Sequence, residues 1–129
     1  MIQDTKVRAA ITAIEAYLPE YILTNEELSH MVDTSDEWIM TRVGIKERRI
    51  LKEPVGMSFM AIKAVKNLLE KNNLQPSDID GIICSTVTPD MVFPSTAAII
   101  SDACGIKNGI SFDMQRQVVI HYKFYCNTN

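Results

Sequence analysis

The spacing of apolar and polar residues predicts strands that alternate with helices. The stretch 7–14 is apolar and β-branched, which predicts a first strand. The nearly continuous apolar centre of 79–87 predicts a strand buried on both faces, as in a parallel sheet. Residues 109–114 predict a last short strand, whereas the charged segment 45–55 is expected to be irregular.

Capping residues predict two short helices after the first strand. Thr24 begins one, with Glu27 three residues later as in a capping box. The apolar face expected for this helix consists of three residues at helical spacing, namely Leu28, Met31 and Val32. Thr34 or Ser35 begins the second helix, and Gly44 is expected to end it.

Two further helices are expected in the second half of the chain. The strongest helical pattern opens at Ser58 and ends at 72–73, with apolar residues at intervals of three and four and lysines on the other face. A shorter helix opens at 94–95 and ends near Gly105. Because strands alternate with helices, the sequence predicts an α/β layered fold with right-handed crossovers.

Composition narrows the class of protein. The chain has 129 residues, of which 47% are hydrophobic and 22% charged, with a formal net charge of −3. This balance argues against general binding to nucleic acid. No apolar run reaches the roughly 18 residues of a membrane span, and the first residues do not resemble a signal peptide. Three cysteines at unrelated spacings fit a reducing cytoplasm.

Few residues suggest chemistry by themselves. Trp38 and Arg42 are four apart and share a helix face, so they could sandwich a flat ring. Spacing alone favours a different interpretation, in which Trp38 anchors the core and Arg42 is a surface charge. Cys84 and Cys104 are expected to be structural thiols and His30 to be solvated. No metal-ligand spacing or phosphate-binding loop is present, so this reasoning ends at an α/β domain.

The segment 33–48 nevertheless closely resembles the N-terminal signature of the β-ketoacyl-acyl carrier protein synthase III family. The blocks 83–90, 93–95 and 105–113 continue the resemblance in the same order. It runs from about residue 7 to residue 115 and implies a thiolase-like α/β fold, of which this chain holds an incomplete first half. We therefore divide the chain into a thiolase-like segment, 1–115, and an aberrant tail, 116–129.

The resemblance also implies an activity. Members of this family start type II fatty-acid synthesis as homodimers. An acyl group moves from acyl-CoA, such as acetyl-CoA, to a cysteine, and malonyl-acyl carrier protein then loses carbon dioxide and attacks the thioester. Coenzyme A enters as a substrate thioester, and no separate cofactor is implied. By this resemblance Thr34, Trp38 and Arg42 contact coenzyme A, and Phe93 enters the acyl pocket of the partner subunit.

The sequence departs from the family after Gln115. The catalytic cysteine is expected near Val118, and the family's second half, with its histidine and asparagine, is missing. A frameshift near codon 116 would explain this change, and the chain as written is expected to be inactive and poorly soluble. Two alternatives stay open. One is a non-catalytic fragment that binds coenzyme A, and the other is a relative that uses another acyl primer, such as a polyketide or quinolone starter.

Overall fold

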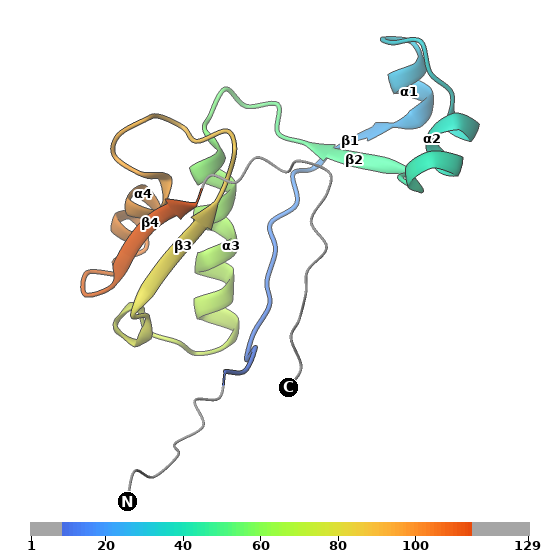
Figure 1. The fold of residues 1–129 in the computed structure, drawn as a ribbon. Coiled ribbons are helices and arrows are strands. Elements are labelled where there is room, and N and C mark those ends of the chain that lie inside the picture. The colour runs from blue at the N-terminus through green and yellow to red at the C-terminus, as the bar shows by residue number, and fades with distance from the viewer. Residues whose placement is uncertain (1–8, 115–129) are drawn as a thin grey trace, which may run out of the picture.

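The computed structural model describes residues 9–114, which form two groups of elements along the chain (Figure 1). The first group contains two strands and two short helices, and the second contains two helices, a short 3-10 turn and two strands. In chain order they are β1 (Tyr21–Thr24), α1 (Asn25–Ser29), α2 (Asp36–Val43), β2 (Glu47–Ile50), α3 (Met57–Lys71), η1 (Pro76–Asp78), β3 (Gly81–Ser85), α4 (Thr96–Ala103) and β4 (Ile110–Met114). This mixture of helix and strand confirms the predicted α/β class.

The first group is an antiparallel strand pair whose connection holds both short helices. Strands β1 and β2 run with Tyr21 opposite Ile50 and Thr24 opposite Glu47. The expectation that 45–55 is irregular is therefore wrong for the four residues of β2. Their charged side chains remain exposed or half-buried at this edge, and the pairing with β1 supplies the backbone hydrogen bonds that define a strand.

The expected strand over 7–14 is also wrong for the residues that the structure describes. Residues 9–14 carry no regular structure, and Ile11 and Ile14 are exposed. A strand needs a neighbour for its ladder, and each of the two sheets contains only its own two strands. The segment runs beside α3 instead, where Glu15 pairs with Lys71 at 2.6 Å and the Tyr17 ring meets the edge of Phe59.

Both short helices begin where the caps predict. The Thr24 hydroxyl accepts from the Glu27 amide at 3.1 Å. The predicted apolar face is wrong, because α1 ends at Ser29 and leaves Met31 and Val32 exposed beyond it. For α2, Ser35 supplies the cap and Gly44 ends the helix in the left-handed region, with φ of 69°.

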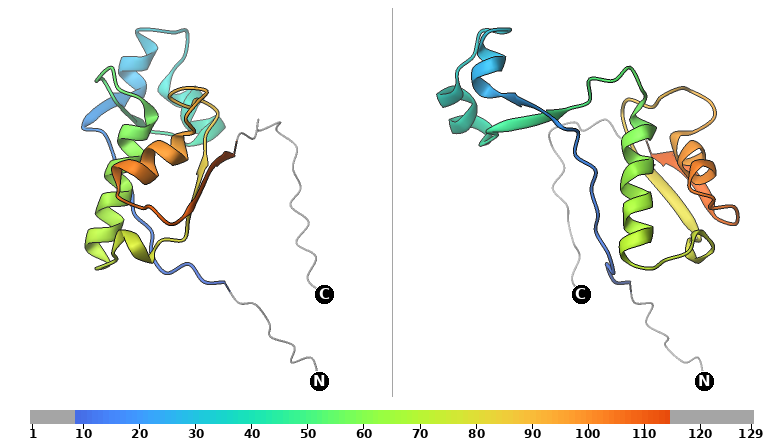
Figure 2. Two further views of the ribbon diagram at one scale, coloured as in Figure 1. Left: turned by 90° about the vertical axis from the view of Figure 1, so that its left-hand side faces the viewer. Right: turned by 180° about the vertical axis from the view of Figure 1, so that it is seen from behind.

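The second group packs its helices against one face of a parallel strand pair. Strands β3 and β4 run in register, and Figure 2 shows α3 and α4 beside them. The core consists of five buried residues, namely Cys84, Ala97, Ile100, Cys104 and Ile106. The opposite face carries Ile83, Phe112 and Met114, which are exposed. The predicted burial of the 79–87 strand on both faces is thus wrong here, because α3 and α4 cover the same face.

Aspartates from other segments accept hydrogen bonds from the N-terminal amides of α3 and α4. The backbone amides of Thr96 and Ala97 donate to the Asp113 carboxylate at 2.7 Å each, which ties β4 to α4. Partial burial of Asp113 opposes ionisation, but these hydrogen bonds outweigh it and lower the pKa of the carboxyl. The Ser58 amide of α3 donates to Asp90 at 3.1 Å. The connection after β3 is therefore fixed to the start of α3.

Candidate functional site

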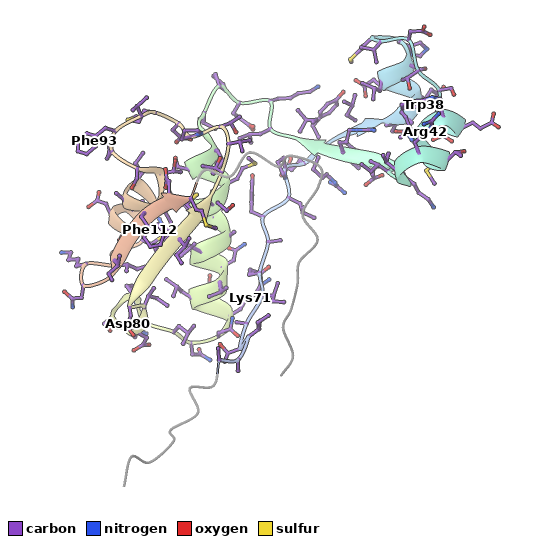
Figure 3. All side chains as sticks on the ribbon, viewed as in Figure 1. Trp38, Arg42, Lys71, Asp80, Phe93 and Phe112 are labelled. Atoms are coloured by element: carbon purple, nitrogen blue, oxygen red, sulfur yellow. The ribbon has the colours of Figure 1, made fainter. Side chains whose placement is uncertain are left out.

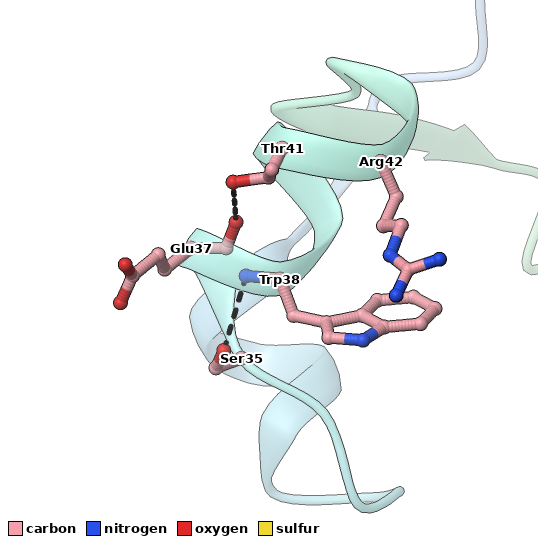
Figure 4. Close-up of a pocket in the computed structure, with 5 residues that line it drawn as sticks. All are labelled: Ser35, Glu37, Trp38, Thr41 and Arg42. Carbon is pink, nitrogen blue, oxygen red and sulfur yellow. Dashed lines mark hydrogen bonds between the residues drawn. The ribbon is translucent and has the colours of Figure 1, made fainter.

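Helix α2 presents an exposed tryptophan with an arginine stacked on it. Trp38 and Arg42 are one turn apart, and the Arg42 Cζ lies 5.5 Å from the centroid of the indole ring (Figure 4). Trp38 is 56% exposed, whereas the next residue, Ile39, about 100° further round the helix, is 4% exposed. The interpretation of Trp38 as a core anchor is therefore wrong, because Ile39 takes the buried side of α2.

Local hydrogen bonds hold this helix in shape. The Trp38 amide donates to the Ser35 hydroxyl at 3.2 Å, and the Thr41 hydroxyl donates to the Glu37 carbonyl at 2.8 Å. Both bonds lie on the far side of the backbone from the indole and guanidinium groups (Figure 4). The two stacked groups are thus left free for a ligand.

Two surface hollows of about 380 Å³ each adjoin Trp38. One is lined by Asp33, Thr34, Ser35 and Trp38. The other is lined by Ser35, Glu37, Trp38, Thr41 and Arg42. The structure thus brings together the three residues predicted to contact coenzyme A, because Thr34 and Arg42 line hollows that share the same indole ring.

The other predicted site residues lie elsewhere. Phe93 is 87% exposed on the connection between β3 and α4, in the other group of elements from Trp38 (Figure 3). Val118, the position expected for the catalytic cysteine, lies outside the described residues, as does the whole tail 116–129. Among residues 9–114 no group of His, Cys, Asp or Glu side chains is arranged to hold a metal ion.

The two thiols among residues 9–114 lie in surroundings that disfavour the reactive thiolate. Cys84 and Cys104 are free and buried. Burial raises the pKa of the Cys84 thiol, and the nearby carboxylates of Asp113 and Asp90 raise it further. Burial also raises the pKa of Cys104, which confirms the structural role expected for both thiols. His30 is exposed, as expected for a solvated side chain.

Sequence reasoning missed the residue that holds α2 in place. Asn25, at the start of α1, is 2% exposed. Its amide nitrogen donates to the Asp36 carboxylate at 2.7 Å and to the Ile45 carbonyl at 2.8 Å. Its amide oxygen accepts from the Arg48 guanidinium at 2.7 Å. A single asparagine in a polar segment gives no sequence signal for this role, because its partners come from three other parts of the chain.

Comparison with known proteins identifies the class of fold and then the family. The structure superposes on β-ketoacyl-[acyl carrier protein] synthase III of Thermus thermophilus with a TM-score of 0.76, at 41% identity over 84% of this chain and 33% of that one. It superposes on the priming β-ketosynthase of the R1128 polyketide pathway with a TM-score of 0.73, at 30% identity over 80% of this chain and 31% of that one. These neighbours confirm a thiolase-like α/β fold. No family model matches the chain.

A curated relative gives the family. The chain is 57% identical to β-ketoacyl-[acyl-carrier-protein] synthase III of Phocaeicola vulgatus over 111 residues, which are 85% of this chain and 33% of the relative. The chain belongs to the β-ketoacyl-[acyl-carrier-protein] synthase III family, as its sequence predicts. It spans about one third of the length of the curated relatives that it matches. No helix within residues 9–114 combines the length and apolar character needed to cross a bilayer.

Proposed function

We propose that the chain is part of a β-ketoacyl-[acyl-carrier-protein] synthase III, and that α2 holds the adenine of coenzyme A. Such a protein condenses acyl-CoA, for example acetyl-CoA, with malonyl-acyl carrier protein to start fatty-acid synthesis. The observation that carries the proposal is the stacking of Arg42 on exposed Trp38, with Thr34 lining a hollow beside the same ring. A flat, aromatic base fits between an indole face and a planar guanidinium.

Binding requires a small movement of Arg42. A ring stacked on both sides needs about 3.5 Å to each neighbour, so the indole and guanidinium must be about 7 Å apart. They are 5.5 Å apart, and Arg42 therefore has to move outward by roughly 1.5 Å. Arg42 is exposed and its side chain has several rotatable bonds, so this movement leaves the helix backbone in place. The Thr34 hydroxyl is then available to hydrogen-bond the nucleotide.

The condensing step needs a nucleophile that residues 9–114 do not supply. By register with the family, this cysteine falls at Val118, in the tail 116–129 that departs from the family segment 1–115. Valine has no group that can accept an acyl chain. We therefore expect the chain as written to bind coenzyme A without catalysing the condensation of the acyl group. A non-catalytic fragment that binds coenzyme A is thus the second candidate function.

Partners, location and primer are further parts of this proposal. Exposed Phe93 suits a contact with a second subunit in a homodimer, and acyl carrier protein is the expected donor of the malonyl group. The free, buried thiols of Cys84 and Cys104 suit the reducing cytoplasm. Similarity to a polyketide priming β-ketosynthase keeps a different acyl primer as an alternative.

Fluorescence titration with coenzyme A tests the proposal directly. Trp38 is the only tryptophan, so any change in its emission reports on this helix. We expect saturable quenching by coenzyme A. Adenosine 3′,5′-bisphosphate should compete, whereas pantetheine should not, because it lacks the base.

Substitution of Arg42 tests the contribution of its guanidinium, and substitution of Lys46 is the matched control. Arg42→Ala should raise the dissociation constant by about two- to fivefold, the range of an exposed cation–π contact. Lys46→Ala removes another exposed cation nearby and should leave the affinity unchanged. Competition by pantetheine but not by the bisphosphate would show that the adenine binds elsewhere, and no saturable response to coenzyme A would refute binding by this chain.

A further inference from the structure

We infer that Asn25 is a positioning residue for the Trp38–Arg42 site, which it serves by fixing both ends of α2. This inference rests on the proposed function of α2. Asn25 is itself 2% exposed and lies too deep to contact a ligand at the surface. Its effect on binding must therefore pass through the helix that carries the two stacked side chains.

The hydrogen bonds of Asn25 reach both ends of α2. One amide hydrogen is donated to Asp36, the first residue of the helix, and the other to the carbonyl of Ile45, two residues after its end. The amide oxygen accepts from Arg48 of β2. One side chain thus uses both donors and its acceptor to join α1, α2 and β2.

Little else holds α2 in its orientation. An isolated helix of eight residues is marginal in water and depends on its packing. Ile39 is the only buried hydrophobic residue of α2. Apolar contacts such as that of Ile39 tolerate rotation of a helix about its axis, whereas directed hydrogen bonds at both ends oppose it. Rotation matters here because consecutive residues are about 100° apart round a helix, so a turn about the axis would move both Ile39 from its buried position and Trp38 from its exposed one.

Swapping the asparagine at position 25 and the aspartate at position 36 tests the inference on the full 129-residue chain. Asn25→Asp places a carboxylate against Asp36, and the donors to Asp36 and Ile45 are lost. We expect the dissociation constant for coenzyme A to rise by about tenfold. In Asn25→Asp/Asp36→Asn the amide introduced at position 36 can donate to the carboxylate at position 25, so the affinity should recover part of this loss, while the donor to Ile45 stays missing. Asn108→Asp adds the same charge at an exposed loop position and should leave binding unchanged.

Hydrogen exchange separates positioning from general unfolding. We expect Asn25→Asp to reduce amide protection in α2 and to leave α3 (Met57–Lys71) unchanged, with α2 protection regained in the exchanged pair. Unchanged affinity in Asn25→Asp would overturn the inference. If Asn25→Asp unfolds as a whole, the double variant Asn25→Asp/Asp36→Asn supplies the test. Amide protection in α2 that returns in this double variant without a return of affinity for coenzyme A would also overturn the inference. Failure of the unsubstituted chain to bind coenzyme A would instead refute the proposed function and, with it, this role of Asn25.

Discussion

The start of α3 offers the sharpest test of how the second group of elements is held together. Its N-cap is Gly56, which has no side chain to accept from the first amides of the helix. Asp90 takes this place from the connection after β3, with its two oxygens 3.1 and 3.3 Å from the Ser58 amide nitrogen. A Cβ atom at position 56 would overlap this carboxylate. Gly56→Ala should therefore displace Asp90 and leave the Ser58 amide without its partner.

The expected magnitude follows from the contact that is lost. The φ angle of Gly56 is −73°, which alanine adopts without strain, so the overlap with Asp90 is the main cost. Loss of a helix N-cap costs about 1 kcal/mol. Gly56→Ala should thus lower the free energy of unfolding by about 1 kcal/mol, and Asp90→Ala should do the same. Because both substitutions remove the same contact, between Asp90 and the Ser58 amide, the free energy of unfolding of the double variant should fall by about 1 kcal/mol rather than about 2 kcal/mol.

Urea unfolding followed by far-ultraviolet circular dichroism measures these changes, since α3 is the longest helix in residues 9–114. The Asp90→Ala background is the matched control. With the carboxylate removed, Gly56→Ala should be nearly neutral. Equal losses from Gly56→Ala in both backgrounds would refute the reasoning, and so would a stabilising effect of Gly56→Ala in the unsubstituted chain.

Three further predictions concern residues outside this contact. The pKa of Asp113 is lowered in the folded chain, so the stabilisation by its carboxylate is present above the unfolded pKa of about 3.9 and is lost as the pH falls through the folded-state pKa. The loss of unfolding free energy caused by Asp113→Asn, measured in urea, should therefore become smaller on acidification. A cost independent of pH would contradict this. Cys84 and Cys104 should react slowly with iodoacetamide, as followed by mass spectrometry, and much faster in urea; equal rates would show that they are accessible in the folded chain. Gly44→Ala should cost about 1 kcal/mol of conformational strain at φ of 69°, with a loss of amide protection at the end of α2, whereas an unchanged exchange rate there would argue against a left-handed C-cap.

Features that depend on neighbouring residues could be predicted from the sequence. The cap Thr24, and a cap at Thr34 or Ser35, could be predicted because a cap accepts from an amide two or three residues ahead, and the structure selects Ser35. Ser95 at α4 follows the same rule, with its hydroxyl accepting from the Ala98 amide at 3.2 Å. The last strand was also found within one residue of its start. These signals are complete within a few residues of sequence.

Features that depend on distant partners could not be predicted in the same way. The strands β1 and β2 are four residues long each, and three of the four residues of β2 are charged, which hides the alternation of apolar and polar residues there. Residues 9–14 have a strand composition, yet no ladder accepts them among the described residues. For the site, spacing placed Trp38 and Arg42 on one face of a helix but could not say whether that face is buried. The structure shows that Ile39, the next residue, takes the buried position and leaves Trp38 exposed.

Polar side chains add direction to the apolar packing that places the helices among residues 9–114. Asn25, Asp90 and Asp113 each reach a helix from a different element, and their partners are 11 to 32 residues away along the chain. These hydrogen bonds are directional, whereas apolar contacts tolerate sliding and rotation. Loss of one of these side chains should therefore misplace one helix before it unfolds the whole chain. In α2 such a displacement would separate Trp38 from the geometry that a nucleotide base requires, which makes ligand affinity a more sensitive measure of these contacts than overall stability.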